Sequence, residues 1–172
     1  VNGILTKPPM QFSEAETEQL ILSCVPAQQR ERLSQGLDAD FAIQTSDGNR
    51  QRVNVFSQQG KLAATIRLLN NTIPSLEELK IPAVLRSLAM EPRGLILVTG
   101  PTGSGKSTTL AAVIDFINSN RAEHIITVED PIEYVYERKL SLIHQREVGV
   151  DVVSFASALR SALREDPDII LV

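Results

Sequence analysis

Apolar residues follow two different spacings in the second half of the chain. Continuous apolar runs occupy residues 94–99, 124–128 and 168–172, and a shorter run lies at 141–144. Such runs are typical of parallel strands that are buried on both faces. Residues 107–117 and 154–164 instead carry apolar side chains three and four positions apart, as amphipathic helices do. The alternation predicts an α/β unit with a parallel sheet flanked by helices. The second of these helices would carry on one face Phe155, Ala158, Leu159, Ala162 and Leu163.

The first seventy residues show helical and strand-like segments in a different order. Two helices are expected, over residues 14–23 and 27–35, followed by three strands, over 39–45, 50–57 and 61–69. Ser13 is a candidate N-cap of the first helix, whose apolar side would hold Leu20, Ile21 and Leu22. Asp47-Gly48 between two strands is a strong hairpin signal. This order predicts a small α+β domain with an antiparallel sheet.

A polar, turn-rich stretch separates the two halves. We interpret residues 70–75 as a linker between a domain over 1–69 and a second one over 76–172. Ser75 and Glu78 form a capping-box pattern that predicts a short helix, and Pro82 suits the first turn of another that ends near Met90. The chain starts at Val1, where residues 1–5 read as the last strand of an earlier part. It stops on an apolar run at Val172, so we expect truncation at both ends.

Composition narrows the possible partners. The 172 residues carry a net charge of −4, so there is no general basic field for nucleic acid or anionic lipid. Cys24 is the single cysteine, which excludes an intramolecular disulfide. No apolar run approaches the ~20 residues of a membrane span. We therefore expect a cytoplasmic protein without direct membrane insertion and without nucleic-acid binding.

Residues 100–108 match G-x-x-x-x-G-K-[ST], the phosphate-binding loop pattern. The predicted strand before it and the helix after it supply the required context, against the alternative of a glycine-rich turn that happens to precede a helix. Glycines let backbone N–H groups approach an anion, and the helix N-terminus adds further donors. Lys106 would reach the β- and γ-phosphates of ATP and Ser107 would bind Mg²⁺. The expected nucleotide-binding residues are Pro101, Thr102, Gly103, Ser104, Gly105, Lys106, Ser107 and Thr108.

Three carboxylates follow the predicted strand at 124–128. Open α/β sheets bind ligands beyond the carboxyl ends of their strands, where Glu129, Asp130 and Glu133 would lie. Glu129 and Glu133 are candidates to orient an attacking water, and Glu129 and Asp130 to join Ser107 around Mg²⁺. An acidic turn without any role is the alternative.

Three arginines stand out on the strands of the first domain. Arg50 and Arg52 share one face of their strand, and Arg67 on the next strand joins them if the register allows. They are either solvated surface residues or a cluster that faces an anion. His124 and His144 lack further metal-ligating residues at useful spacing, so we interpret both as structural.

Three segments carry a resemblance to a known family. Residues 128–134 (VEDPIEY), 144–149 (HQREVG) and 158–172 (ALRSALREDPDIILV) resemble the secretion-ATPase superfamily, and within it the type IV pilus retraction ATPases of twitching motility. The resemblance implies a PAS-like domain over residues 1–69 and a RecA-like P-loop ATPase core over 76–172. The family's usual Arg-Phe-Arg is Arg50-Gln51-Arg52 here. Its catalytic glutamate would follow Val172, outside this chain.

The resemblance further implies how such a protein works. It would hydrolyse ATP and couple this to pilus disassembly as a homohexameric ring, with Arg50, Arg52 and Arg67 approaching a neighbour's nucleotide. Its partner would be the pilus platform protein, at the cytoplasmic face of the inner membrane. The isolated segment would hydrolyse ATP poorly. The alternatives are a pilus-assembly or type II secretion ATPase of the same superfamily, a nucleotide-binding regulatory subunit that does not hydrolyse and, more weakly, a nucleic-acid translocase.

Overall fold

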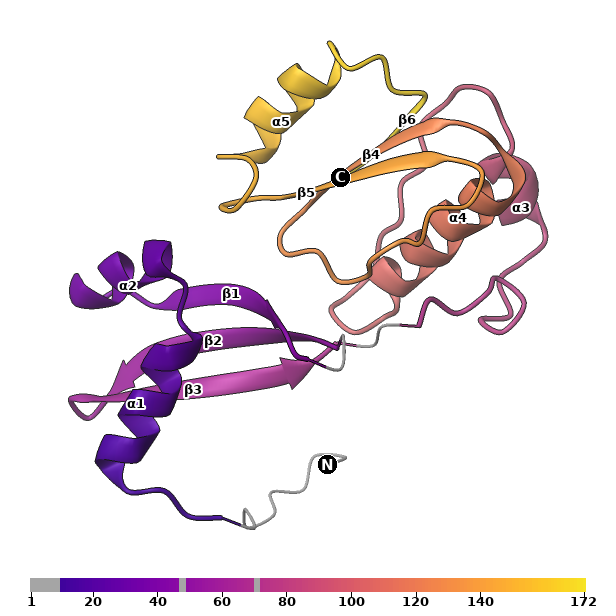
Figure 1. Cartoon of the computed structure of the whole chain (residues 1–172). Helices are drawn as coiled ribbons and strands as arrows, with labels where there is room; N and C mark the ends of the chain where they lie inside the picture. The colour runs from indigo at the N-terminus through magenta and orange to yellow at the C-terminus, as the bar shows by residue number, and fades with distance from the viewer. Residues whose placement is uncertain (1–9, 47–48, 70–71) are drawn as a thin grey trace. The chain divides into compact units, whose positions relative to one another are not determined.

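The computed structural model describes residues 10–46, 49–69 and 72–172 (Figure 1). The chain divides into two compact units, residues 1–68 and 69–172. The predicted Asp47-Gly48 turn, the strand expected at 1–5 and the Asn70-Asn71 part of the linker lie outside the described residues. Each unit is built around its own three-stranded sheet.

The first unit has two helices followed by three antiparallel strands, in the predicted order. These are α1 (Glu14–Cys24), α2 (Ala27–Ser34), β1 (Ala39–Gln44), β2 (Arg50–Gln58) and β3 (Lys61–Leu68), with strand order β1-β2-β3. Ser13 starts α1 with a complete capping box to Glu16. Thr45 and Asn49 hold the ends of the β1–β2 connection through a backbone hydrogen bond of 2.9 Å.

One face of this sheet forms the core of the first unit. Its buried residues are Val25, Ala39, Phe41, Val53 and Val55. Ile21 of α1 packs against this core, but Leu20 and Leu22 are exposed, so the predicted apolar side of the helix is wrong for these two. The helix turns only one residue of that run toward the sheet, since neighbouring positions lie about 100° apart on a helix.

The second unit is an α/β structure with a parallel sheet, as predicted. It contains α3 (Val84–Ala89), α4 (Lys106–Asn120), β4 (His124–Glu129), β5 (Leu142–Glu147), α5 (Phe155–Ala162) and β6 (Ile169–Leu171), with strand order β5-β4-β6. The central strand β4 is buried on both faces: Ile125 packs with α4, whereas Ile126 and Val128 pack with α5 (Figure 1). Burial on both faces explains why this strand reads as a continuous apolar run.

Several predicted elements of the second unit differ in the structure. Residues 94–99 form no strand, and Leu95 and Leu97 are 82% and 75% exposed. The reason is that none of the described strands pairs with this run, and a strand needs a ladder partner for its backbone groups. Residues 76–80 are turns rather than a helix, although Ser75 and Glu78 make both capping-box hydrogen bonds. Two residues of the predicted apolar face of α5 are exposed: Leu163 follows the end of the helix and is 76% exposed, and Phe155 is 38% exposed.

Candidate active site

The glycine loop leads directly into the first turn of α4. Gly103 and Gly105 have φ of 79° and 91°, in the left-handed region that favours glycine, and Gly105 is the N-cap of the helix. The helix begins at Lys106, so its first N–H groups have no partner within the helix. The positive end of the helix dipole lies at the same place. This geometry suits an anion such as a phosphate group.

Lys106 is the cation of this loop. Its Nζ donates to the carbonyl oxygens of Gly100 and Pro101, at 3.0 and 2.9 Å. The side chain is half-buried, and these two hydrogen bonds hold the ammonium on the loop itself. When a phosphate group binds, its oxygens would replace these two carbonyl oxygens as acceptors. Hydrogen bonds from an ammonium to charged phosphate oxygens are stronger than those to neutral carbonyl oxygens.

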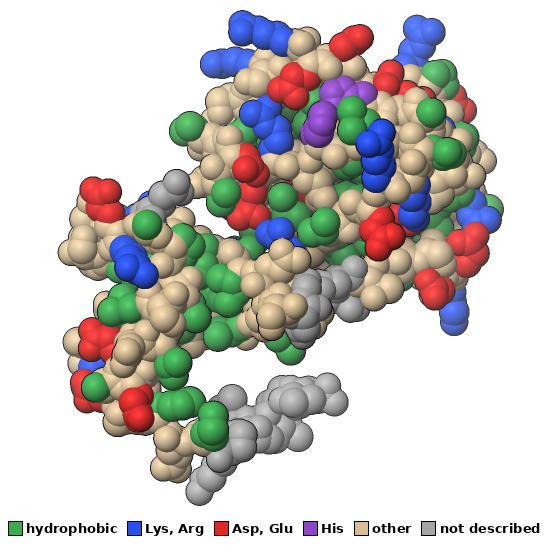
Figure 2. Space-filling model, viewed as in Figure 1, with side chains coloured by type: hydrophobic (Ala, Val, Ile, Leu, Met, Phe, Trp, Pro, Cys, Tyr) green, Lys and Arg blue, Asp and Glu red, His purple; other side chains and the backbone are tan. Residues whose placement is uncertain are grey.

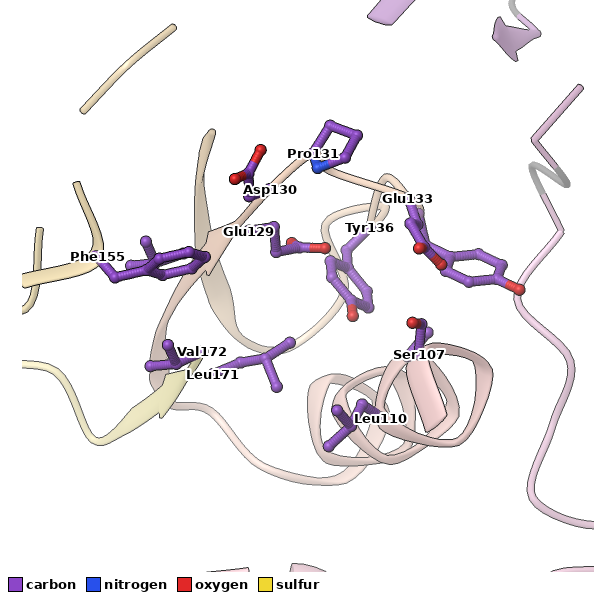
Figure 3. A pocket seen from close by; sticks show the side chains of 13 residues that line it. Ser107, Leu110, Glu129, Asp130, Pro131, Glu133, Tyr136, Phe155, Leu171 and Val172 are labelled. Atoms are coloured by element: carbon purple, nitrogen blue, oxygen red, sulfur yellow. The ribbon is translucent and has the colours of Figure 1, made fainter. Parts of the chain in front are cut away.

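A cavity of about 180 Å³ lies beside the first turn of α4. Its walls are the helix at Ser107 and Leu110, the end of β4 at Glu129 with the loop 130–136 that follows it, Phe155 of α5 and the end of β6 (Figure 3). Figure 3 shows the carboxylate of Glu133 above Ser107, whereas that of Glu129 is directed toward the ring of Tyr136 in the same cavity. The structure thus brings two of the three predicted carboxylates to the predicted phosphate loop, as expected for residues at the carboxyl end of a parallel strand.

Asp130 is placed differently from the other two. Its side chain is exposed and, in Figure 3, is directed away from α4 and Ser107. It is nevertheless part of the cavity wall. A direct role of Asp130 beside Ser107 at a metal ion therefore has less geometric support than a role of Glu129.

Glu129 is a half-buried carboxylate with several donors around it. Thr127 Oγ1 donates to its Oε1 at 2.6 Å and Gln145 Nε2 donates at 3.3 Å. Burial raises the pKa of Glu129 above its usual range, and these two hydrogen bonds oppose the rise without cancelling it. The carboxylate therefore holds its proton more tightly than an exposed glutamate. Burial next to Glu129 also raises the pKa of the Tyr136 phenol.

The loop 130–136 is joined to both the helix and the sheet. Thr108 Oγ1 of α4 and the hydroxyl of Tyr134 lie 3.2 Å apart, within hydrogen-bond distance. Gln145 and Glu147 of β5 bind the loop's backbone from the other side. Sequence reasoning missed these two residues. Their alternation on a strand was the available signal, because residues two apart share one face.

The three arginines lie on one face of the first unit's sheet. Arg52 and Arg67 are directly opposite each other on β2 and β3, and Arg50 is two residues from Arg52. The register therefore allows the cluster. Arg52 forms a two-point ion pair with Asp40 of β1, at 3.1 and 2.6 Å. All three guanidinium groups therefore belong to one face of this sheet.

The two histidines meet at the other end of the parallel sheet. His124 Nε2 and His144 Nδ1 are 3.0 Å apart, and Figure 2 shows both rings on the surface. Within the ranges that the structure describes, no three histidine, cysteine, aspartate or glutamate side chains gather in a way that could hold a metal ion. No helix among the same residues is long and apolar enough to cross a membrane.

Known proteins resemble this chain over most of its length. The chain is 49% identical over 162 residues to a twitching motility protein of Neisseria gonorrhoeae, covering 94% of this chain and 43% of that protein. It is 46% identical over 165 residues to a type IV pilus retraction ATPase of Pseudomonas aeruginosa, covering 96% of this chain and 47% of the relative. The chain thus spans a little less than half the length of these relatives.

A solved structure resembles the chain, and one family description matches most of its residues. The crystal structure of a pilus retraction motor with bound ADP superimposes with a TM-score of 0.86 at 50% identity, over 88% of this chain and 44% of the other. The family described as "Type II/IV secretion system protein" matches residues 22–172. By this match and by its 46–49% identity to the two relatives, the chain belongs to the type II/IV secretion system protein family.

Proposed function

We propose that this protein is an ATP-hydrolysing motor of the type IV pilus retraction type, which couples ATP hydrolysis to pilus disassembly. One observation carries the proposal: Glu129 and Glu133 line the same cavity as Ser107, in the first turn of a helix that follows a phosphate-binding loop, and the Glu133 carboxylate is directed toward Ser107. The loop provides donors for phosphates, and the carboxylates provide acceptors for a water molecule. Hydrolysis needs both beside the same reacting phosphorus atom.

The phosphate groups would be held by residues 101–108. Backbone N–H groups of the loop and of the first helical turn would bind phosphate oxygens, and Lys106 would exchange its two carbonyl partners for them. The predicted strand–loop–helix context is only half present here, because residues 94–99 form no strand. The helix and the left-handed glycines nevertheless supply the anion-binding geometry.

The residues around Ser107 fit Mg²⁺. The Ser107 side chain is exposed at the cavity, and Glu129 is a carboxylate that lines the same cavity. Mg²⁺ prefers oxygen ligands and usually completes its shell with waters and substrate phosphates, so a cluster of three carboxylates is not required. When bound, it would neutralise charge on the β- and γ-phosphates. Asp130, exposed at the rim, would act through a metal-bound water.

Glu133 and Glu129 would position the attacking water. Glu133 faces Ser107 directly, whereas Glu129 is fixed by Thr127 and Gln145. The raised pKa of Glu129 makes it a better proton acceptor than an ordinary glutamate. Both would act on a water that attacks the γ-phosphate in line with the leaving oxygen.

The remaining parts of the proposal concern the whole protein. We assign residues 1–69 to a PAS-like domain, 70–75 to a linker and 76–172 to a RecA-like ATPase core. The protein would assemble as a homohexameric ring at the cytoplasmic face of the inner membrane and act on the pilus platform protein. Arg50, Arg52 and Arg67 would stabilise the γ-phosphate bound by a neighbouring subunit, since arginine forks bind phosphate oxygens and stay charged.

Glu133→Gln tests the proposed chemistry. We expect this variant to lower kcat at least 10-fold while KM for Mg-ATP changes little, because an oriented water matters mainly in the transition state. The measurement is phosphate release by an extended chain, in which the residues that follow in the gonococcal relative are joined after Val172. This chain without the extension should release phosphate much more slowly.

Glu137→Gln is the matched control, because Glu137 is an exposed glutamate of the same connection and does not line the cavity. It should behave like the parent protein. If the parent binds ATP and releases no phosphate, the protein is a regulatory subunit instead. A raised KM with unchanged kcat in Glu133→Gln would make Glu133 a binding residue.

A further inference from the structure

We propose that Gln145 and Glu147 of β5 are positioning residues that hold the loop 130–136, and with it Glu129 and Glu133, over the phosphate loop. This inference rests on the proposed ATP hydrolysis for its functional consequence. The two side chains are two positions apart on one strand, so they share the face opposite to the intervening Arg146. Arg146 instead binds Glu165, at 3.0 Å.

Both polar atoms of the Gln145 carboxamide form hydrogen bonds with the loop 130–136 or with Glu129 at the end of β4. Its Oε1 accepts the backbone N–H of Tyr136 at 3.0 Å. Its Nε2 donates to the carbonyl oxygen of Tyr134 at 2.7 Å and to Glu129 Oε1 at 3.3 Å. An amide nitrogen has two hydrogens to donate, so both are used and the side chain has one orientation that satisfies all three partners.

Glu147 binds the loop nearer to its beginning. The side chain is only 7% exposed, and its Oε2 accepts the backbone N–H of Ile132 at 3.1 Å. The backbone of Glu147 is itself fixed, because its N–H donates to Asp151 Oδ2 at 2.8 Å and its carbonyl accepts the N–H of Asp151 at 2.8 Å. A buried carboxylate held in this way is a rigid anchor rather than a surface charge.

The anchored positions surround the carboxylate that faces Ser107. The loop is held at the backbone of Ile132, Tyr134 and Tyr136, and Glu133 lies between the first two of these. Residue 132 is buried, so that end of the loop cannot exchange these partners for water without local opening. Sites held by side chains of a regular strand are placed more accurately than sites on a free loop. The strand β5 therefore sets where Glu133 and Glu129 stand.

Two isosteric substitutions with opposite expectations test this inference. In Gln145→Glu, the donors to Tyr134 and Glu129 are lost, and a second negative charge faces Glu129. We expect repulsion between the two carboxylates to move this side chain, and with it the acceptor oxygen for the Tyr136 N–H, away from its place. In Glu147→Gln, an acceptor oxygen for the Ile132 N–H remains, whereas Glu147→Ala removes it. Arg146→Gln is the control, since it changes the same strand on the face away from the loop. If Gln145→Glu does not fold, the Glu147→Ala and Glu147→Gln pair makes the same comparison.

The measurements are backbone hydrogen exchange at residues 132 and 136 in this chain, and kcat and KM in the extended chain. We expect roughly 2–10-fold faster exchange at residue 136 in Gln145→Glu and at residue 132 in Glu147→Ala. We expect kcat to fall on the order of 10–100-fold with KM within about threefold, as for a misplaced catalytic group. Glu147→Gln and Arg146→Gln should stay within about threefold in both measurements.

Unchanged exchange and unchanged kcat in Gln145→Glu and Glu147→Ala would overturn the inference. An equal loss in Arg146→Gln would also overturn it, because the effect would then come from the strand in general. Exchange that speeds up without any change in kcat would show that the loop is anchored but that its position does not matter. If the parent protein neither binds nor hydrolyses ATP, the proposed function fails, and the exchange results still decide whether Gln145 and Glu147 hold the loop.

Discussion

Lys106→Ala should remove most of the stabilisation that Mg-ATP gives to this protein. The substitution deletes the ammonium that now binds the carbonyls of Gly100 and Pro101. It leaves the glycines, the helix N-terminus and the cavity in place. The loss is therefore one of phosphate binding, and the unliganded protein should change its free energy of unfolding by no more than about 1 kcal/mol, since both lost hydrogen bonds are half-exposed.

The size of the effect follows from the bonds exchanged. A hydrogen bond to a charged group contributes about 1.5–3 kcal/mol. Because binding also gives up two neutral carbonyl partners, we take about 2 kcal/mol as the net loss, which weakens binding roughly 30-fold. At a nucleotide concentration about 100 times the parent Kd, the parent gains about 2.7 kcal/mol and the variant about 0.9 kcal/mol. For a unit of this size, these values correspond to Tm shifts of about 12 °C and about 4 °C.

The assay is thermal unfolding with and without Mg-ATP at that fixed concentration. Lys139→Ala is the control: Lys139 binds Asp115 in the middle of α4, at 2.7 Å, and lies outside the cavity wall. It should lower the basal Tm somewhat and keep the full shift. A shift for Lys106→Ala as large as that of the parent protein would refute the assignment of the phosphate loop. Loss of the shift in both lysine variants would point to a general charge effect.

Three further predictions use other parts of the molecule. Because burial raises the pKa of Glu129, ionisation of this side chain lowers the free energy of unfolding as pH rises above the ordinary glutamate range. Glu129→Gln should therefore be more stable than the parent protein in urea unfolding at pH 8, and the difference should vanish near pH 4. Extended chains that carry Arg52→Ala or Lys106→Ala should each be nearly inactive alone, since arginine fingers can contribute ~10³–10⁵ in kcat. When the two variants are co-assembled, ATPase activity should return. If no activity returns, Arg52 acts on its own subunit's nucleotide or has no catalytic role. Arg121→Ala frees the Ala89 carbonyl at 3.2 Å and should cost about 1–3 kcal/mol in unfolding free energy while the nucleotide shift persists.

The elements that the sequence predicts well are those decided by local chemistry. Ser13 and Ser154 each make the capping hydrogen bonds that start their helices, and Gly105 takes the left-handed conformation before α4. The antiparallel hairpin and the buried parallel strand β4 also follow from short patterns. In each case, the residues that determine the element lie within or beside it.

The predictions that fail depend on distant partners. Residues 94–99 have the composition of a buried strand, but a strand forms only beside another, and none of the described strands pairs with them. Leu163 belongs to the apolar stripe of α5, but the helix ends before it can be buried. The shared face of Arg52 and Arg67 also depended on register, which the sequence left open and the structure supplies.

Glu129 and the loop 130–136 depend both on local residues and on distant partners. For this reason, only part of the candidate site could be predicted from the sequence. On β4, Ile125, Thr127 and Glu129 share the face toward α4, and they change from apolar to hydroxyl to carboxylate along the strand. The sequence shows this gradient, which leads from the core to the cavity. It does not show that Gln145, sixteen residues later, binds Glu129 and the loop beyond it. A carboxylate whose burial costs free energy keeps its place only if such partners hold it. The remaining residues of the site can therefore be inferred from its carboxylates. A buried carboxylate requires hydrogen-bond donors nearby, and the parallel register of β4 and β5 places the donors of Gln145 beside Glu129.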